Sequence, residues 1–159
     1  MERANLRLPQ VGESEPSFSK SVLAPAVQSA TSALREYGAV ITGPGLSPVL
    51  SVRTASMEFI PDVAVLFHRE RILAIEAKFI GSSGRQQALT QALGQSIVYR
   101  ALGYRHSVVV IADVSRSVTL ASASEIADLI SMAGSSAVVI YGTKSDPKVK
   151  IRLFSPVGR

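Results

Sequence analysis

The chain has 159 residues, a length that fits one domain with a hydrophobic core of its own. It contains no cysteine, which excludes disulfides, zinc–thiolate sites and cysteine nucleophiles. Its net charge of +5 and its isoelectric point near 9.9 favour a polyanionic partner such as nucleic acid. No apolar run reaches the roughly 18 residues of a membrane span, and no signal-peptide pattern is present, so we expect a cytoplasmic protein without a membrane partner.

The N-terminal third predicts one helix and two short strands. Residues 1–16 show no hydrophobic period, and we expect them to be loosely ordered. Residues 18–37 carry apolar side chains at helical spacing, with Pro25 either starting or kinking that helix. Residues 39–42 predict a strand, and residues 48–53 predict an edge strand after a turn-rich connection.

Residues 62–68 and 72–79 predict a β-hairpin. A three-residue loop at 69–71 matches the apolar faces of the two strands and sets Asp62 directly across from Lys78 and diagonal to Glu76. A two-residue loop would turn Asp62 to the other face unless a bulge intervened. The pattern therefore favours convergence of two carboxylates and one ammonium at one end of the sheet.

The second half of the chain alternates predicted helices and strands. We expect helices at 85–102, closed by Gly103, and at about 124–133, the latter capped by the Ser122–Glu125 capping box. We expect strands at 107–114 and 137–142, both buried on two faces, and a last strand at 148–154 with one basic face. That basic face would serve a polyanion or simply protect a solvated edge strand. This order indicates an α/β fold, in one domain over 1–159, with a mixed β-sheet flanked by helices.

Two carboxylates a few ångströms apart repel each other, and a hard divalent cation relieves that repulsion. Mg²⁺ takes oxygen ligands and keeps several waters, and Mn²⁺ would substitute for it. Such an ion would make a bound water more acidic for attack on a phosphodiester, with Lys78 as orienting group, weak base or transition-state cation. The alternative is a plain cross-strand ion pair between Asp62 and Lys78, with Glu76 at the solvent edge.

The residues resemble a known superfamily. Pro61-Asp62 followed by Glu76-Ala77-Lys78 resembles the motif of the PD-(D/E)xK nucleases, whose fold is restriction-endonuclease-like with an αβββαβ core. In the helix after this motif, Gln95 and Tyr99 resemble the Gln-x-x-x-Tyr helix of RecB-like members, and the likeness spans about residues 18–114. The resemblance implies Asp62, Glu76 and the Ala77 carbonyl as metal ligands, Lys78 as the catalytic lysine, Gln95 as a supporting catalytic residue and Tyr99 as a contact to the substrate backbone.

One feature departs from that resemblance. Many members place an acidic residue in the first helix, facing the metal. The candidates here are Glu36, Glu58 and Glu15, and none is assigned.

The segment from 78 to 105 contains four basic residues and no acidic one, so we expect Arg85, Arg100 and Arg105 to contact nucleic-acid phosphates, with the 148–152 strand as a further candidate. The expected function is a Mg²⁺-dependent DNA nuclease, an endonuclease acting as a homodimer. The alternative is a weak or inactive nucleic-acid-binding or assembly module of the same fold.

Overall fold

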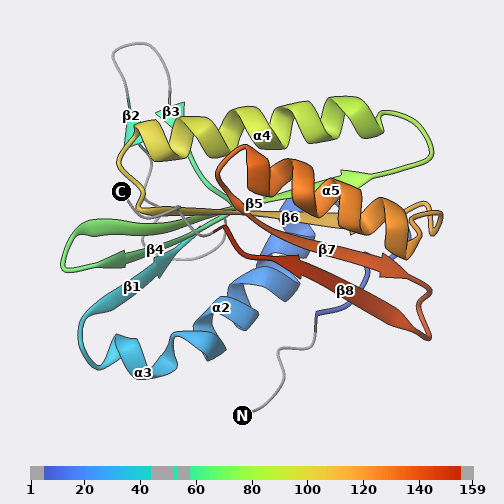
Figure 1. Ribbon diagram of the computed structural model, residues 1–159. Coiled ribbons are helices and arrows are strands. Elements are labelled where there is room, and N and C mark those ends of the chain that lie inside the picture. The colour runs from blue at the N-terminus through green and yellow to red at the C-terminus, as the bar shows by residue number, and fades with distance from the viewer. Residues whose placement is uncertain (1–5, 44–51, 54–57, 155–159) are drawn as a thin grey trace.

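The computed structural model describes residues 6–43, 52–53 and 58–154 of the chain. Over these residues it is an α/β fold built on a six-stranded mixed sheet, with helices on both faces (Figure 1). The general architecture predicted from the sequence is therefore confirmed. None of the described helices is long and apolar enough to cross a membrane.

The sheet has the strand order β1-β4-β5-β6-β7-β8. The three central strands β5, β6 and β7 run parallel, and β1, β4 and β8 complete the sheet by antiparallel pairing. A separate two-stranded sheet pairs β2 with β3. The bounds are β1 Ala39–Thr42, β2 Val52–Arg53, β3 Glu58–Phe59, β4 Val63–Phe67, β5 Glu70–Ile80, β6 His106–Asp113, β7 Ser136–Gly142 and β8 Pro147–Arg152.

The N-terminal helical segment is divided into four short elements. These are α1 Glu15–Phe18, the π-helical turn η1 Ser19–Leu23, α2 Ala24–Ala30 and α3 Ser32–Arg35. The π-helical turn ends at Leu23, two residues before Pro25, which lies in the first turn of α2. Proline has no N–H to donate, so it is tolerated where a helical hydrogen-bonding pattern restarts. The sequence therefore located this irregularity correctly.

The segment before α1 is packed rather than loosely ordered over its described part. Leu8 and Pro9 are buried, and Arg7 makes a bidentate ion pair with Glu13 at 2.7 and 2.8 Å. Arg116 also donates to the carbonyl of Pro9. The expectation of loose order is thus wrong for residues 6–16, because polar composition concealed specific pairing.

The β4–β5 hairpin differs from its predicted register. Its turn has two residues, His68 and Arg69, both with positive φ, and β5 begins already at Glu70. The pairing then shifts between Val65 and Leu66, where Ile72 is the extra residue of a bulge. The predicted three-residue loop and the pairing of Asp62 with Lys78 are therefore wrong, although the bulge restores the predicted faces.

The helices α4 Arg85–Ala101 and α5 Leu120–Met132 connect the parallel strands. Gly103 follows α4 with a φ of 92°, as the predicted C-terminus requires. Helix α5 starts earlier than predicted, because Thr119 rather than Ser122 is its N-cap and accepts a hydrogen bond from the Ser122 N–H. The two residues of the predicted capping box lie inside the helix.

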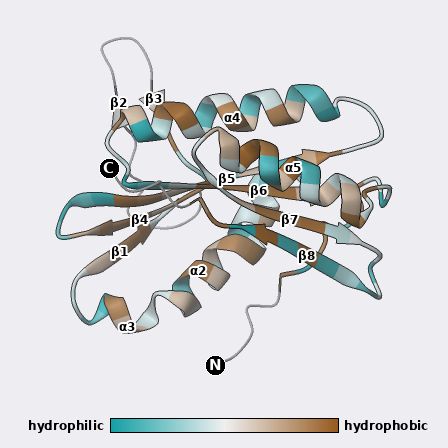
Figure 2. Ribbon diagram, viewed as in Figure 1, coloured by the Kyte–Doolittle hydropathy of each residue, from teal (hydrophilic) through white to brown (hydrophobic). Residues whose placement is uncertain are grey.

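Two hydrophobic cores lie on the two faces of the sheet, whose central strands are largely hydrophobic (Figure 2). One core packs the N-terminal helices against side chains such as Val63, Ile75 and Ala77. The other packs α4 and α5 against side chains such as Ile111 and Val139. Side chains alternate along each strand, so Glu76 and Lys78 lie on the α4 face.

Candidate active site

The candidate site lies where β5 extends beyond its partner β4. The last cross-strand pair is Val63 with Ile75, while β5 continues to Ile80. Beyond that pair, two carboxylates accept hydrogen bonds from backbone N–H groups of β5. Asp62 Oδ2 accepts from the Ala77 N–H at 2.8 Å, and Glu15 Oε1 accepts from the Phe79 N–H at 2.8 Å. Acidic side chains therefore pair with the N–H groups of Ala77 and Phe79 along this edge of β5, where β4 is no longer paired.

Lys78 joins two of the acids. Its Nζ donates to Glu76 Oε1 at 3.0 Å and to Glu15 Oε2 at 3.3 Å. Burial lowers the pKa of Lys78, but the charges of Glu76, Glu15 and Asp62 and the hydrogen bond to Glu76 outweigh it, and the net pKa lies above its usual value. Lys78 therefore remains an ammonium at neutral pH.

Asp62 carries the clearest electrostatic perturbation of the site. Burial raises its pKa to about 7, and the negative charge of Glu76 adds to this effect. The hydrogen bond from Ala77 and the charge of Lys78 oppose the rise without cancelling it. With all three acids ionised, the site holds three negative charges against one ammonium, an excess that a divalent cation would offset.

Tyr99 has a different place from the one predicted. It is 2% exposed, so it is not positioned to contact a substrate backbone, and that expectation is corrected. Its hydroxyl lies 2.9 Å from Glu76 Oε2 and 3.2 Å from the carbonyl oxygen of Ile60, and its one proton is shared between these two acceptors, with the shorter contact to Glu76. Burial and the charge of Glu76 raise the pKa of Tyr99, which keeps the hydroxyl protonated.

Gln95 precedes Tyr99 by one helical turn on α4 and shares its face. Its Oε1 is buried, and no described residue donates a hydrogen bond to it. A buried amide oxygen without a donor is costly, and such atoms often accept from a bound water. The contact of Gln95 with the acids remains a prediction.

The three arginines expected to bind phosphate lie in two places: Arg85 is at the start of α4, and Arg100 and Arg105 line one pocket near its end. Arg85 lies at the start of α4 and donates to Ser117 Oγ at 3.4 Å. Arg100 donates to the carbonyl of Ala133 at the end of α5, and its partly buried side chain serves as a helix cap.

Arg105 forms an ion pair with Glu70, the first residue of β5. Glu70 lies six residues from Glu76, about 20 Å along an extended strand. Arg105 therefore lies near the end of β5 that is away from the acids, and the contact of Arg100 and Arg105 with nucleic-acid phosphates remains a prediction.

Glu15 is the acid that sequence reasoning left unassigned. It opens α1, the first helix, and reaches both β5 and Lys78. Glu36 is exposed at the end of α3, and the side chain of Glu58 lies outside the described residues. A local signal was present: Ser14 is a typical N-cap and Pro16 a typical first-turn residue, which together predict a helix start at Glu15.

The donor set suits a hard cation only in part. Among the described residues, no group of three acidic or histidine side chains is arranged to hold a metal ion. Mg²⁺ needs less than that, because it is usually bound by one or two carboxylates and several waters. Asp62 and Glu76 supply two carboxylates, and the Ala77 carbonyl points to the same strand edge as its N–H, towards Asp62. These residues fit a water-rich Mg²⁺ site.

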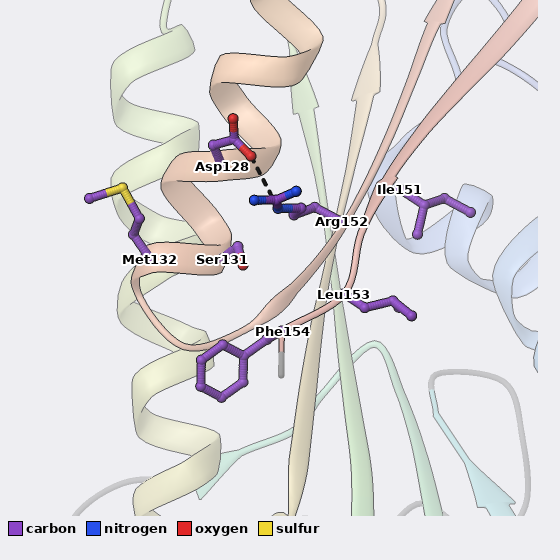
Figure 3. Close-up of a pocket in the computed structure, with 7 residues that line it drawn as sticks. All are labelled: Asp128, Ser131, Met132, Ile151, Arg152, Leu153 and Phe154. Carbon is purple, nitrogen blue, oxygen red and sulfur yellow. Dashed lines mark ion pairs between the residues drawn. The ribbon is translucent and has the colours of Figure 1, made fainter. Parts of the chain in front are cut away.

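A separate cavity of about 810 Å³ lies between α5 and β8, away from the acids (Figure 3). An ion pair of 3.2 Å between Arg152 and Asp128 crosses it, and apolar side chains such as Met132 and Leu153 line it. This cavity lacks the converging acids of the candidate site. The basic face of β8 lies on the same side of the sheet as Glu76, but β8 is the third strand from β5 in the strand order.

Comparisons with known proteins give no match to this chain: no family model, no curated protein and no solved structure is significantly similar.

Proposed function

We propose that this protein is a Mg²⁺-dependent nuclease that hydrolyses phosphodiester bonds in DNA. The observation that supports it most directly is the convergence of Glu15, Asp62 and Glu76 around Lys78 at the free edge of β5. A cross-strand ion pair alone would need one acid and one base. Three acids around a single lysine leave an excess of negative charge, which costs stability unless a cation is bound.

Asp62, Glu76 and the Ala77 carbonyl would hold the metal ion, which would supply a more acidic water and offset charge on the phosphorane oxygens. A water oxygen attacks phosphorus and gives up a proton to solvent, the P–O bond to the leaving oxygen breaks, and that oxygen takes up a proton from solvent.

Lys78 acts as a donor to the attacking water or to a non-bridging oxygen. Its raised pKa keeps it charged and so argues against a role as general base. Glu15 and Glu76 both accept from Lys78 Nζ and together fix the direction of the ammonium. Homodimerisation, which would present two such sites to a duplex, remains a prediction that sedimentation analysis tests.

The deciding experiment measures cleavage of linear, circular, branched and single-stranded DNA, with RNA as a further substrate, by purified protein with Mg²⁺. Glu76→Gln and Lys78→Met each remove a charge at similar size and should lower the rate at least about 100-fold. Glu125→Gln and Lys144→Met are matched controls, because both residues are exposed and far from the site in sequence. Undiminished cleavage in both site variants would disprove the assignment, and DNA binding without cleavage by the parent would favour the inactive-module alternative.

A further inference from the structure

We propose that Tyr99 is a positioning residue that orients Glu76 and sets its spacing from the segment that carries Asp62. This inference rests on the proposed function, because it names the group that holds one of the metal-binding carboxylates in place. Tyr99 does not touch the substrate, since only 2% of it is exposed.

Glu76 has one hydrogen-bond donor on each of its carboxylate oxygens. This residue is 4% exposed, and its two carboxylate oxygens have separate donors: Lys78 on Oε1 and Tyr99 on Oε2. A buried carboxylate that keeps one donor and loses the other is free to rotate towards the remaining one. Without the Tyr99 hydroxyl, Glu76 is expected to turn towards Lys78.

The Tyr99 hydroxyl lies between β5 and the segment that precedes β4. The β4–β5 ladder stops at Val63, so no backbone hydrogen bond fixes the distance between Ile60 and Glu76. Tyr99 lies within hydrogen-bonding distance of both, at 3.2 and 2.9 Å. The hydroxyl thus connects the segment before β4 to β5 beyond the last pair of the ladder.

Tyr104 is a second buried tyrosine beside Tyr99 and shows what packing alone would require. Tyr104 is 3% exposed and stacks edge-to-face on Tyr99, with 6.0 Å between ring centroids. Both rings belong to one small core cluster with Ala64 and Ala74. Of these two tyrosines, only Tyr99 donates to a carboxylate of the site, so packing accounts for its ring and leaves its hydroxyl unexplained.

The test compares Tyr99→Phe with Tyr104→Phe, since each variant keeps a buried ring and loses one hydroxyl. Mn²⁺ binding is measured by calorimetry without DNA, and kcat and KM are measured with linear DNA over a range of Mg²⁺ concentrations. Loss of a residue that orients a metal ligand typically weakens metal binding about 10- to 100-fold, and we expect this for Tyr99→Phe. The Mg²⁺ concentration for half-maximal cleavage should rise, kcat should fall and KM for DNA should stay unchanged. Tyr104→Phe should behave as the parent in each respect.

Two results would overturn the inference in distinguishable ways. If the parent binds Mn²⁺ and Tyr99→Phe binds it equally well, the hydroxyl has only a structural role and the proposed nuclease function is unaffected. If the parent neither binds Mn²⁺ nor cleaves DNA, the proposed function fails and this inference fails with it. Thermal unfolding of both variants separates these effects from a general loss of stability.

Discussion

Asp62 accepts a hydrogen bond from the backbone N–H of Ala77, at 2.8 Å, beyond the last pair of the β4–β5 ladder. The side chain of Asp62, just before β4, therefore accepts the hydrogen bond that a backbone carbonyl of β4 would otherwise accept from β5. This arrangement holds the carboxylate in a partly buried place beside Glu76, and it is the reason that its pKa rises to about 7.

We predict that Asp62→Asn stabilises the metal-free protein at pH 8 and not at pH 4. The pKa of Asp62 is about 7 in the folded protein and near 3.8 when unperturbed, so the folded state holds the proton more tightly. The free energy of unfolding therefore falls as pH rises from about 4 to 7, and the full penalty is present above pH 7. Asparagine keeps an acceptor for Ala77 without this penalty, and the expected gain at pH 8 is on the order of 2 kcal/mol. Urea unfolding with a chelator at both pH values measures it, with Asp146→Asn as an exposed control. An equal change at both pH values would contradict the prediction.

We predict that Mg²⁺ or Mn²⁺ raises the stability of the parent and not of Asp62→Asn. A ligand that binds only the folded state, at 100 times its dissociation constant, adds about 2.7 kcal/mol. Thermal unfolding with and without the ion measures this effect at pH 8, where Asp62 is ionised. If the ion stabilises both proteins alike, it binds elsewhere.

We predict that Glu15→Gln lowers the cleavage rate at least about ten-fold while the protein stays folded. Glutamine still accepts from the Phe79 N–H, but it no longer provides the negative charge beside Lys78. Steady-state kinetics and circular dichroism are the measurements. Glu36→Gln is the matched control, since Glu36 is exposed at the end of α3. Equal rates for the two variants would exclude Glu15 from the site.

We predict that Glu13→Gln destabilises the protein at pH 7 by about 1–2 kcal/mol. The hydrogen bonds from Arg7 lower the pKa of Glu13 to about 2. This stabilisation is fully present above the unperturbed value of 4.5 and is lost as pH falls towards 2. Urea unfolding of parent and variant between pH 7 and pH 3 measures the difference, which should shrink with acidity. A difference that does not depend on pH would show that the ion pair is not its source.

We predict that Arg100→Ala lowers stability and leaves the salt dependence of DNA binding unchanged. Arg100 donates to the last turn of α5, so its removal exposes a helix end and costs about 1 kcal/mol. A residue that binds phosphate would instead reduce the slope of log affinity against log salt by about one. Fluorescence anisotropy between low and moderate salt measures this slope. A reduced slope would place Arg100 on the DNA-binding surface.

The sequence predicts the sheet and its helices well, because the spacing of hydrophobic residues along the chain indicates which side chains are buried. The strands at Val63, His106 and Ser136 and the helix at Arg85 begin within one residue of their expected positions. The hairpin register was wrong because a bulge at Ile72 has no signature in residue type.

The site was predicted in part. Asp62, Glu76 and Lys78 come together as expected, whereas Glu15 lies 47 residues before Asp62 and required tertiary packing to be found. Tyr99 lies beside the acids as predicted, but it is buried and does not face a substrate. The helical spacing of residues shows which side of α4 it is on and not how deeply it is buried.

The extra residue at Ile72 makes the hairpin sensitive to changes in its length. Deleting that single position would invert every later side chain of β5, which would turn Glu76 towards the N-terminal helices and Ala77 towards α4. A deletion in the exposed turn between β7 and β8 has no such effect on β5. Homologues of this chain should therefore tolerate insertions and deletions near Lys144 and reject single-residue ones between His68 and Ile75.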